Sequence, residues 1–184
     1  EEENALYTIA YQCSSVVTIL VTSLNTAFAP WLGEKLHEDA FNEIRAFSKK
    51  YVLIFLYFAL GIMLISPDIM MIMGGKPYME AKYVMPPVML GCVCQFVYTM
   101  YVNVEQFKKK TVGMAIASAS AAIINYVLNY LLIPKFGYIS AAYTTLFSFI
   151  WLLGIHMLLV RYLGYSKTYP NKFILSAVGL AVVI

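Results

Sequence analysis

Amide and hydroxyl side chains recur at helical spacing within long apolar segments of this 184-residue chain. Residues three and four apart lie on the same face of a helix, so each series forms a polar stripe. The stripes comprise Tyr11, Ser15, Thr18, Thr22 and Asn25; Gly91, Gln95, Thr99 and Asn103; and Thr111, Ala115, Ser118, Ala122, Asn125 and Asn129. Polar groups are costly in lipid, so such stripes face either other helices or a water-filled cavity.

The residues alone leave both interpretations open. Close helix packing explains small residues such as Ser, Thr and Ala, whereas amides cost more to bury unpaired. The residues that we predict to line a substrate cavity are Gln95, Asn103, Asn125, Asn129, Asn25 and Thr22. The apolar segment 51–65 carries no polar stripe, so we expect it to face lipid.

Ionisable side chains are scarce in the apolar segments. Glu105 and Asp68 lie near segment ends, where lipid headgroups or water can solvate them, and Glu105 can also neutralise Lys108 or Lys109. His156 lies late in the fifth segment, where a hydrogen-bonded packing role and a proton relay are both open. Glu105 and His156 are therefore the candidates for a coupling-ion or proton site.

Other kinds of chemistry find no support in the sequence. The cysteines Cys13, Cys92 and Cys94 lie in apolar stretches and are expected to be small apolar fillers, not metal ligands. No phosphate-binding loop, HExxH or CxxC motif occurs. The basic residues sit in links between apolar segments, and no basic face carries interleaved aromatics, which argues against a nucleic-acid partner. We expect no catalytic residue, no metal and no cofactor.

The elements that must position these side chains are membrane-spanning helices. The chain is 61% hydrophobic and only 12% charged, whereas soluble domains are about 25% charged. A bilayer core takes about 20 apolar residues as a helix, because backbone groups in lipid must pair within their own segment. The predicted spans are residues 5–32, 51–73, 83–107, 111–133 and 138–160, with a sixth, truncated span over 173–184. Short links make neighbouring spans antiparallel, which predicts an all-α membrane bundle.

The longest link, residues 33–50, has its own periodicity. Leu36, Ile44 and Phe47 recur at helical spacing between charged residues. This pattern predicts one amphipathic helix on the cytoplasmic membrane surface, with a solvated soluble helix as the alternative.

Basic residues are distributed unevenly between the links. Ten of the 13 Lys and Arg residues fall in the alternate links 33–50, 108–110 and 161–172. The positive-inside rule therefore places these three links in the cytoplasm. The chain lacks an initiating Met and ends inside the apolar run 180–184, so we expect a piece of a longer protein, without a signal peptide.

Prolines mark positions where a helix can bend, since they remove a backbone hydrogen bond. The hinge candidates are Pro30, Pro67, Pro86 and Pro87. Transporters use broken helices as sites and hinges, although static membrane proteins contain kinks as well.

Three stretches in order resemble a known family. They are LYTIAYQ with TILVTSLNTAFAPWLGEKL (6–12 and 18–36), SPDIMMIMGGKPYMEAKYVMPPVMLG (66–91) and NYVLNYLLIPKFGYISAAYTTLFSF (125–149). They resemble the second half of polysaccharide flippases, which belong to the multidrug/oligosaccharidyl-lipid/polysaccharide exporter superfamily. The resemblance covers nearly the whole chain.

The resemblance implies a transporter of two helix bundles, of which this chain is most of the second. It implies location in the bacterial inner membrane and alternating-access transfer of undecaprenyl-diphosphate-linked oligosaccharide for O-antigen, capsule or exopolysaccharide synthesis. Membrane lipid and other polysaccharide assembly proteins are the candidate partners. No Lys or Arg lies deep in the spans, so cations for a diphosphate must come from span ends or from the other half.

Three alternatives stay open. The same superfamily includes cation-coupled drug exporters and peptidoglycan-precursor flippases. A membrane enzyme of envelope polysaccharide synthesis would need a large outer loop, whereas the predicted outer links 74–82 and 134–137 are short. A non-transporting helical scaffold would bury the polar stripes in dry contacts.

Overall fold

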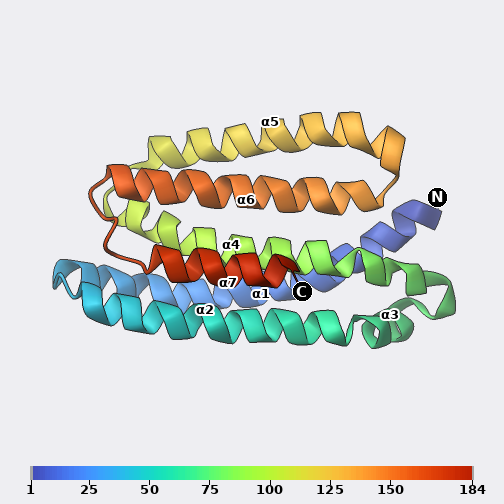
Figure 1. The fold of residues 1–184 in the computed structure, drawn as a ribbon, viewed down its shortest axis with the longest axis horizontal. Helices are drawn as coiled ribbons and strands as arrows, with labels where there is room; N and C mark the ends of the chain where they lie inside the picture. Colours follow the sequence, from blue (N-terminus) through green and yellow to red (C-terminus); the bar gives the residue numbers. More distant parts are fainter. Residues whose placement is uncertain (1, 184) are drawn as a thin grey trace.

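The computed structural model describes the backbone of residues 2–183. It also describes the side chains in this range, apart from residues 2–7, 9–11, 13, 73, 74, 77, 78, 81, 182 and 183. The elements are α1 (Glu2–His37), α2 (Phe41–Leu64), α3 (Ser66–Gly74), the 3-10 helix η1 (Lys76–Tyr83), α4 (Met85–Phe107), α5 (Thr111–Phe136), α6 (Ile139–Tyr162) and α7 (Asn171–Val183). The long helices run along one common axis (Figure 1). No strand occurs among the described residues, and the predicted all-α class is confirmed.

Five helices are long and apolar enough to cross a membrane. They are α1, over its part Ser14–His37, and α2, α4, α5 and α6. These helices correspond to the five complete spans predicted from the sequence. The sixth predicted span overlaps α7, an apolar helix that is too short to meet the same criterion, and Ile184 lies outside the described residues.

Residues 33–50 do not form one surface helix, so that prediction is wrong. α1 continues to His37, and the chain reverses over 38–40 into α2. Asp39 takes a positive φ of 52° at the reversal, a conformation that commonly ends helices. The apolar residues of the link explain the difference, because Leu36 and Ile44 are only 3% and 0% exposed and pack into the helix core. The helical spacing was correct, but it belongs to the ends of two helices.

The four hinge candidates occupy different helical positions. Pro67 lies in the first turn of α3, directly after the break that ends α2, so the predicted interruption of the second span is confirmed. Pro86 and Pro87 lie in the first turn of α4, where a missing backbone N–H leaves no bond unmade. They therefore begin a helix and do not interrupt one. Pro30 lies within α1. Whether these prolines act as hinges stays a prediction.

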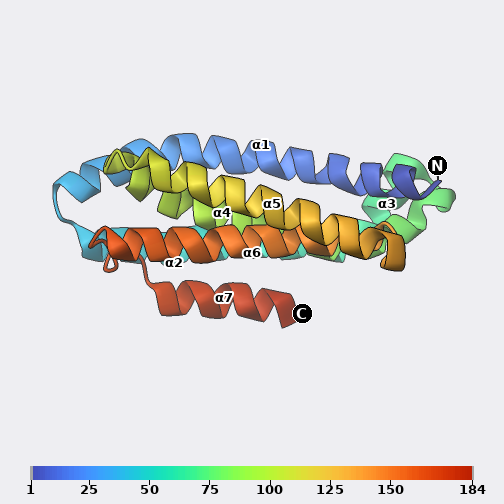
Figure 2. The same cartoon turned by 90° about the horizontal axis from the view of Figure 1, so that it is seen from above.

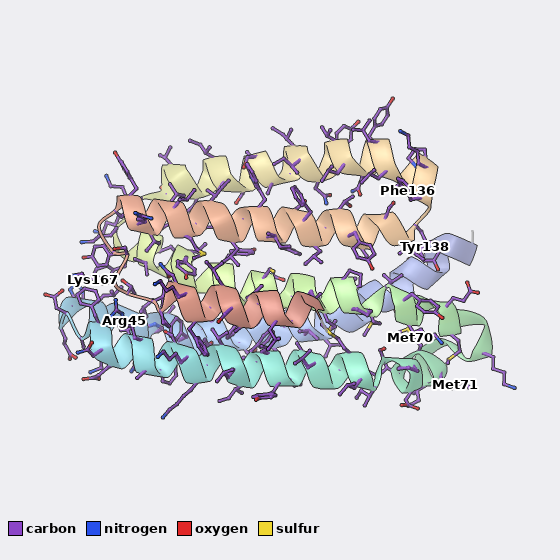
Figure 3. All side chains as sticks on the ribbon, viewed as in Figure 1. Arg45, Met70, Met71, Phe136, Tyr138 and Lys167 are labelled. Carbon is purple, nitrogen blue, oxygen red and sulfur yellow. The ribbon has the colours of Figure 1, made fainter. Side chains whose placement is uncertain are left out.

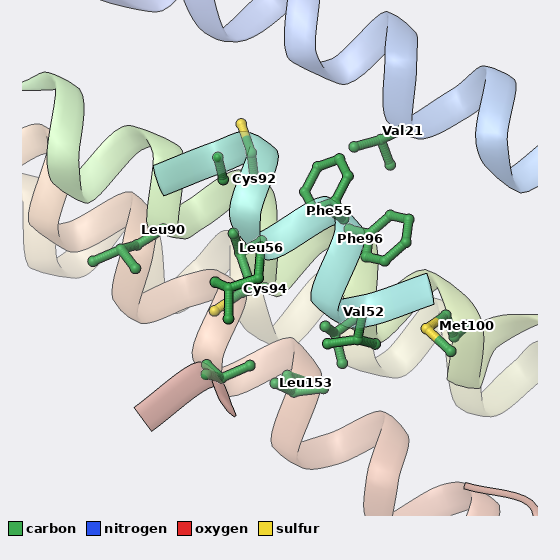
Figure 4. Packing of buried hydrophobic residues seen from close by; sticks show 14 of the residues in the cluster. Val21, Val52, Phe55, Leu56, Leu90, Cys92, Cys94, Phe96, Met100 and Leu153 are labelled. Atoms are coloured by element: carbon green, nitrogen blue, oxygen red, sulfur yellow. The ribbon is translucent and has the colours of Figure 1, made fainter. Parts of the chain in front are cut away.

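α4 is the centre of the bundle. It packs against α6, α1 and α2, while α5 packs mainly on α6. The rings of Phe55 in α2 and Phe96 in α4 stack with their centroids 4.1 Å apart, and Val21 of α1 lies beside them (Figure 4). Figure 2 shows α7 on the far side of α2 and α6 from α1. The core thus lies around α4, and α5 contributes only Ala117 and Ala121 to buried positions.

The links that hold most basic residues gather at one end of the bundle. The α1–α2 turn, the α4–α5 turn and the α6–α7 connection lie at the left in Figure 1, and the α5–α6 turn lies at the right with α3 and η1. We call these the basic end and the opposite end. The predicted charge asymmetry therefore corresponds to two physical ends of one helical bundle.

Gly137 connects α5 to α6 in a conformation that other residues avoid. α5 runs past the expected stop at Ile133 and through Pro134, and Gly137 caps it with φ 73° and ψ −170°. We expect Gly137→Ala to lower the free energy of unfolding by about 1–3 kcal/mol, since this backbone region is essentially restricted to glycine.

A matched control separates backbone strain from crowding. A Cβ atom at Gly137 or at Gly154 would meet no other atom within 4 Å, but only Gly137 has a positive φ. Gly154→Ala, inside α6, should be neutral or stabilising because alanine favours helices. Unfolding in mixed micelles measures both variants, and equal losses would contradict the conformational explanation.

Candidate functional site

A cavity of about 480 Å³ lies between α1, α4 and α6. Its polar lining consists of Ser14, Ser15 and Thr18 from α1, Gln95 from α4 and Thr145 from α6. Its apolar lining includes Phe149 and Gly91. No charged side chain is among the described residues that line it. The cavity therefore offers hydroxyl and amide groups between membrane-length helices.

The local structure of the three helices shapes this lining. Thr18 and Thr145 donate hydrogen bonds to carbonyls of their own helices, Ser14 O at 3.0 Å and Ala141 O at 2.8 Å, so their oxygens remain available as acceptors. Gly91 adds no side chain, and a Cβ atom there would lie 3.2 Å from the Phe149 ring. The glycine thus keeps α4 close to α6 while leaving space beside it.

Of the predicted cavity residues, only Gln95 lines this cavity. Asn103 instead donates a hydrogen bond from Nδ2 to Oδ1 of Asn25 at 2.7 Å, which joins α4 to α1. Thr22 is exposed, and its hydroxyl donates to the Thr18 carbonyl at 2.9 Å. The polar stripes of α1 and α4 therefore combine a cavity with interhelical contact. Tyr11 and Cys13 lie outside the described side chains.

Asn125 and Asn129 form a second network, between α5 and α6. Asn129 donates from Nδ2 to Asn125 Oδ1 at 3.0 Å, and the hydroxyl of Thr144 donates to Asn129 Oδ1. All three side chains are at least partly buried. These amides pair with each other and with α6, which corresponds to the helix-packing interpretation of their stripe.

The two ionisable candidates, Glu105 and His156, contact each other. His156 Nδ1 and Glu105 Oε1 are 2.7 Å apart, and the side chains are 2% and 1% exposed. The ring of Tyr98 stacks on His156 with centroids 5.6 Å apart. Burial removes the predicted alternative that headgroups or water solvate Glu105. Asp68, in contrast, is exposed, as expected for a residue at a span end.

Glu105 is also one of the residues that line a small hollow. Oε2 is buried and has no hydrogen-bond partner among the described residues. A hollow of about 180 Å³ is lined by Glu105, Lys110, Gly113 and Tyr162, together with two leucines. A buried carboxylate oxygen without a partner is costly, and whether Glu105 exchanges a proton or contacts a cation stays a prediction.

The cavity and the buried pairs occupy different depths of the bundle. Asn103 and Glu105 follow Gln95 on α4 by distances of roughly 12 and 15 Å, at 1.5 Å rise per residue. They lie toward the basic end, whereas the cavity lies toward the opposite end. Among the described residues, no group of three His, Cys, Asp or Glu side chains could hold a metal ion, and Cys92 and Cys94 are buried free thiols.

Comparison with known families gives one match. The sequence profile of MatE matches residues 2–131, which is more than half of the chain. The chain belongs to the MatE family. No curated protein and no solved structure gave a significant match.

Membership of the MatE family makes this protein a multi-pass membrane transporter of the multidrug/oligosaccharidyl-lipid/polysaccharide exporter superfamily. The predicted superfamily is thereby confirmed. Members of the MatE family are transporters and not enzymes. The matched region includes the α1 and α4 walls of the cavity and Glu105, while Thr145 and His156 on α6 lie beyond it.

The sequence pattern did not single out the polar residues of α6. Thr145 lines the cavity, and Thr144 is buried in the amide network. One signal for this polar face was nevertheless present in the sequence. The small polar residues Ser140, Thr144 and Ser148 are spaced four residues apart, and all three are buried. Such spacing predicts a polar face, but α6 contains no amide to draw attention to it.

Proposed function

We propose that this MatE protein transfers undecaprenyl-diphosphate-linked oligosaccharide from the cytoplasmic to the outer leaflet of the bacterial inner membrane, for O-antigen or related polysaccharide synthesis. The cavity of about 480 Å³ carries this proposal. Sugar hydroxyls pair well with side-chain hydroxyls and an amide, and the uncharged lining suits a neutral sugar chain. Phe149 adds an apolar ring against which a sugar face can pack. The pattern favours loose recognition of the sugars.

Two buried polar pairs close the route between the cavity and the basic end, as one state of an alternating-access cycle requires. Asn25–Asn103 joins α1 to α4, and Glu105–His156 joins α4 to α6. Both pairs lie between the cavity and the basic end, so a head group entering from that end requires them to separate. Alternating access to the cavity from that end therefore requires α4 to move relative to α1 and α6, as a gating motion within the bundle. The lipid tail stays in the bilayer.

We infer that the Glu105–His156 pair couples transport to a cation gradient, with the proton as the ion exchanged. Histidine changes its charge near neutral pH more readily than other side chains, and intramembrane ionisable pairs commonly mark proton relays. Gain or loss of a proton by this pair would change which of the two joined atoms can donate the hydrogen bond between α4 and α6. Separation of α4 from α6 would then depend on the proton gradient.

The same buried carboxylate favours a second candidate, a cation-coupled drug exporter of this superfamily. Such an exporter needs an acidic residue within the helix bundle, and Glu105 is 1% exposed. A peptidoglycan-precursor flippase would use the same cavity with another lipid-linked sugar. These candidate transporters therefore differ in the molecule that they carry, and identifying that molecule distinguishes them.

Depletion of the whole protein in its own cells tests the proposal. We expect lipid-linked repeat units to accumulate on the cytoplasmic leaflet, where impermeant sugar-modifying reagents added outside do not reach them. Restoring the protein should release them to the outer leaflet. Normal transfer together with increased drug sensitivity would replace the proposal with drug export, and trapped peptidoglycan precursor would replace it with the third cargo.

A further inference from the structure

A second hollow, of about 480 Å³, lies at the basic end, between α2, α7 and the segment that precedes α7. Its polar lining includes Arg45 and Lys49 of α2 and Ser166, Asn171 and Lys172 of the neighbouring segment and α7. No carboxylate lines it. It is separate from the transport cavity, which lies toward the opposite end.

Two of the three cations, Arg45 and Lys49, are placed at this hollow by contacts across it. Arg45 donates from Nε to the Lys167 carbonyl at 2.6 Å, which uses one of five guanidinium N–H donors and fixes the group. Figure 3 shows Arg45 and Lys167 together at the end where α7 begins. Lys49 Nζ lies 5.8 Å from the centroid of the Phe173 ring. The cations from α2 are thereby placed against the first turn of α7.

The backbone and neighbouring groups add to the positive potential. α7 begins at Asn171, and the first N–H groups of a helix have no partner within it. Tyr169 donates its hydroxyl to the Met100 carbonyl at 2.8 Å. Burial raises the pKa of the Tyr169 phenol well above its ordinary value, so this ring brings no negative charge. The nearby Glu43 is paired with Lys35 at 3.1 Å.

Below the hollow, the same two helices continue with exposed apolar side chains. Ile54 of α2 is 70% exposed, and Leu175 and Leu180 of α7 are 52% and 62% exposed. A ligand that fits both the basic hollow and the exposed apolar side chains of α2 and α7 has a phosphate head and an acyl tail. Basic groups at the cytoplasmic end of a membrane protein attract anionic lipid headgroups.

We propose that Arg45, Lys49 and Lys172 form a site for the phosphate of an anionic phospholipid of the cytoplasmic leaflet, whose acyl chain follows α2 and α7. The phosphate accepts hydrogen bonds from the guanidinium and the two ammonium groups. The site does not depend on the cargo proposed above. It fixes α7 to α2 through a lipid, at the end of the bundle where the polar pairs must open.

Titration of phosphatidylglycerol onto the whole purified protein, with lipid-bound species counted by native mass spectrometry, tests this site. Lys49→Gln with Lys172→Gln should weaken phosphatidylglycerol binding about a hundredfold, because each replacement loses a hydrogen bond from an ammonium group to the phosphate, and each such bond contributes a factor of about ten or more. Lys50→Gln with Lys109→Gln is the matched control. It removes the same charge from two exposed residues at the same end that do not line the hollow.

Further variants and ligands distinguish a specific lipid site from general surface charge and from a site for free phosphate. Lys49→Arg with Lys172→Arg keeps the charge and should retain binding, and helicity and elution volume confirm that each variant is folded. Phosphatidylcholine should bind far more weakly, and excess inorganic phosphate should not displace the lipid. Equal losses in the site and control variants would reduce the effect to surface charge. Unchanged binding in the site variant, or displacement by inorganic phosphate, would also overturn the proposal.

Discussion

Replacing His156 with leucine is expected to lower the free energy of unfolding by about 3–5 kcal/mol, because it leaves the Glu105 carboxylate buried without its partner. Both side chains are almost fully buried, and the joined atoms are 2.7 Å apart. Unfolding of the purified protein in mixed micelles measures the loss.

A double replacement distinguishes an ion pair from simple packing. Glu105→Leu with His156→Leu should recover most of the loss, since apolar replacement of a buried pair is often nearly neutral. His37→Leu is the matched control, because His37 is exposed and only contacts the edge of the Phe107 ring. A loss below about 1 kcal/mol in His156→Leu would show that the buried pair contributes little.

The same double variant separates stability from coupling. It should fold, yet its transfer of lipid-linked sugar should no longer respond to an imposed proton gradient. A gradient response equal to that of the unchanged protein would remove the pair from the coupling mechanism while leaving the cargo untouched. Unfolding measurements thus test whether the Glu105–His156 contact stabilises the fold. Transport measurements test whether the same contact couples transfer to the proton gradient.

The helices could be predicted from the sequence because each helix depends on the residue types within its own segment. A run of about 20 apolar residues must pair its backbone internally in lipid, and the predicted span 83–107 corresponds to α4 at Met85–Phe107. The prediction failed at residues 33–50, where charge suggested a membrane surface. α1 and α2 extend into that segment because Leu36 and Ile44 pack in the core.

The candidate site could be predicted only in part. Asn125 and Asn129 are four residues apart, so a shared helix face was readable, but their partner Thr144 lies on another helix. Glu105 and His156 are 51 positions apart, and no periodicity relates residues on different helices. Their contact arises from the packing of α4 against α6, which local sequence rules do not encode. The residue types indicated the chemistry, and tertiary packing determined which groups pair.

Filling the transport cavity should stop transfer without unfolding the bundle. Thr18 lines the cavity on α1 and is half-buried. We expect Thr18→Trp to reduce the transfer of lipid-linked sugar roughly tenfold or more, because the indole removes volume and takes from the head group at least two hydrogen bonds worth about 1 kcal/mol each. The leaflet assay with impermeant reagents measures the rate.

Thr26 provides the matched control for this substitution. It lies two turns further along α1, is exposed and makes the same kind of bond, from its hydroxyl to the Thr22 carbonyl at 2.9 Å. Thr26→Trp therefore adds the same ring to the same helix outside the cavity, and transfer should continue. If both variants transfer normally, sugars do not pass between α1, α4 and α6. If only Thr18→Trp fails while its helicity and unfolding match those of Thr26→Trp, the block lies in the cavity itself, because the two proteins differ only in where the ring is placed.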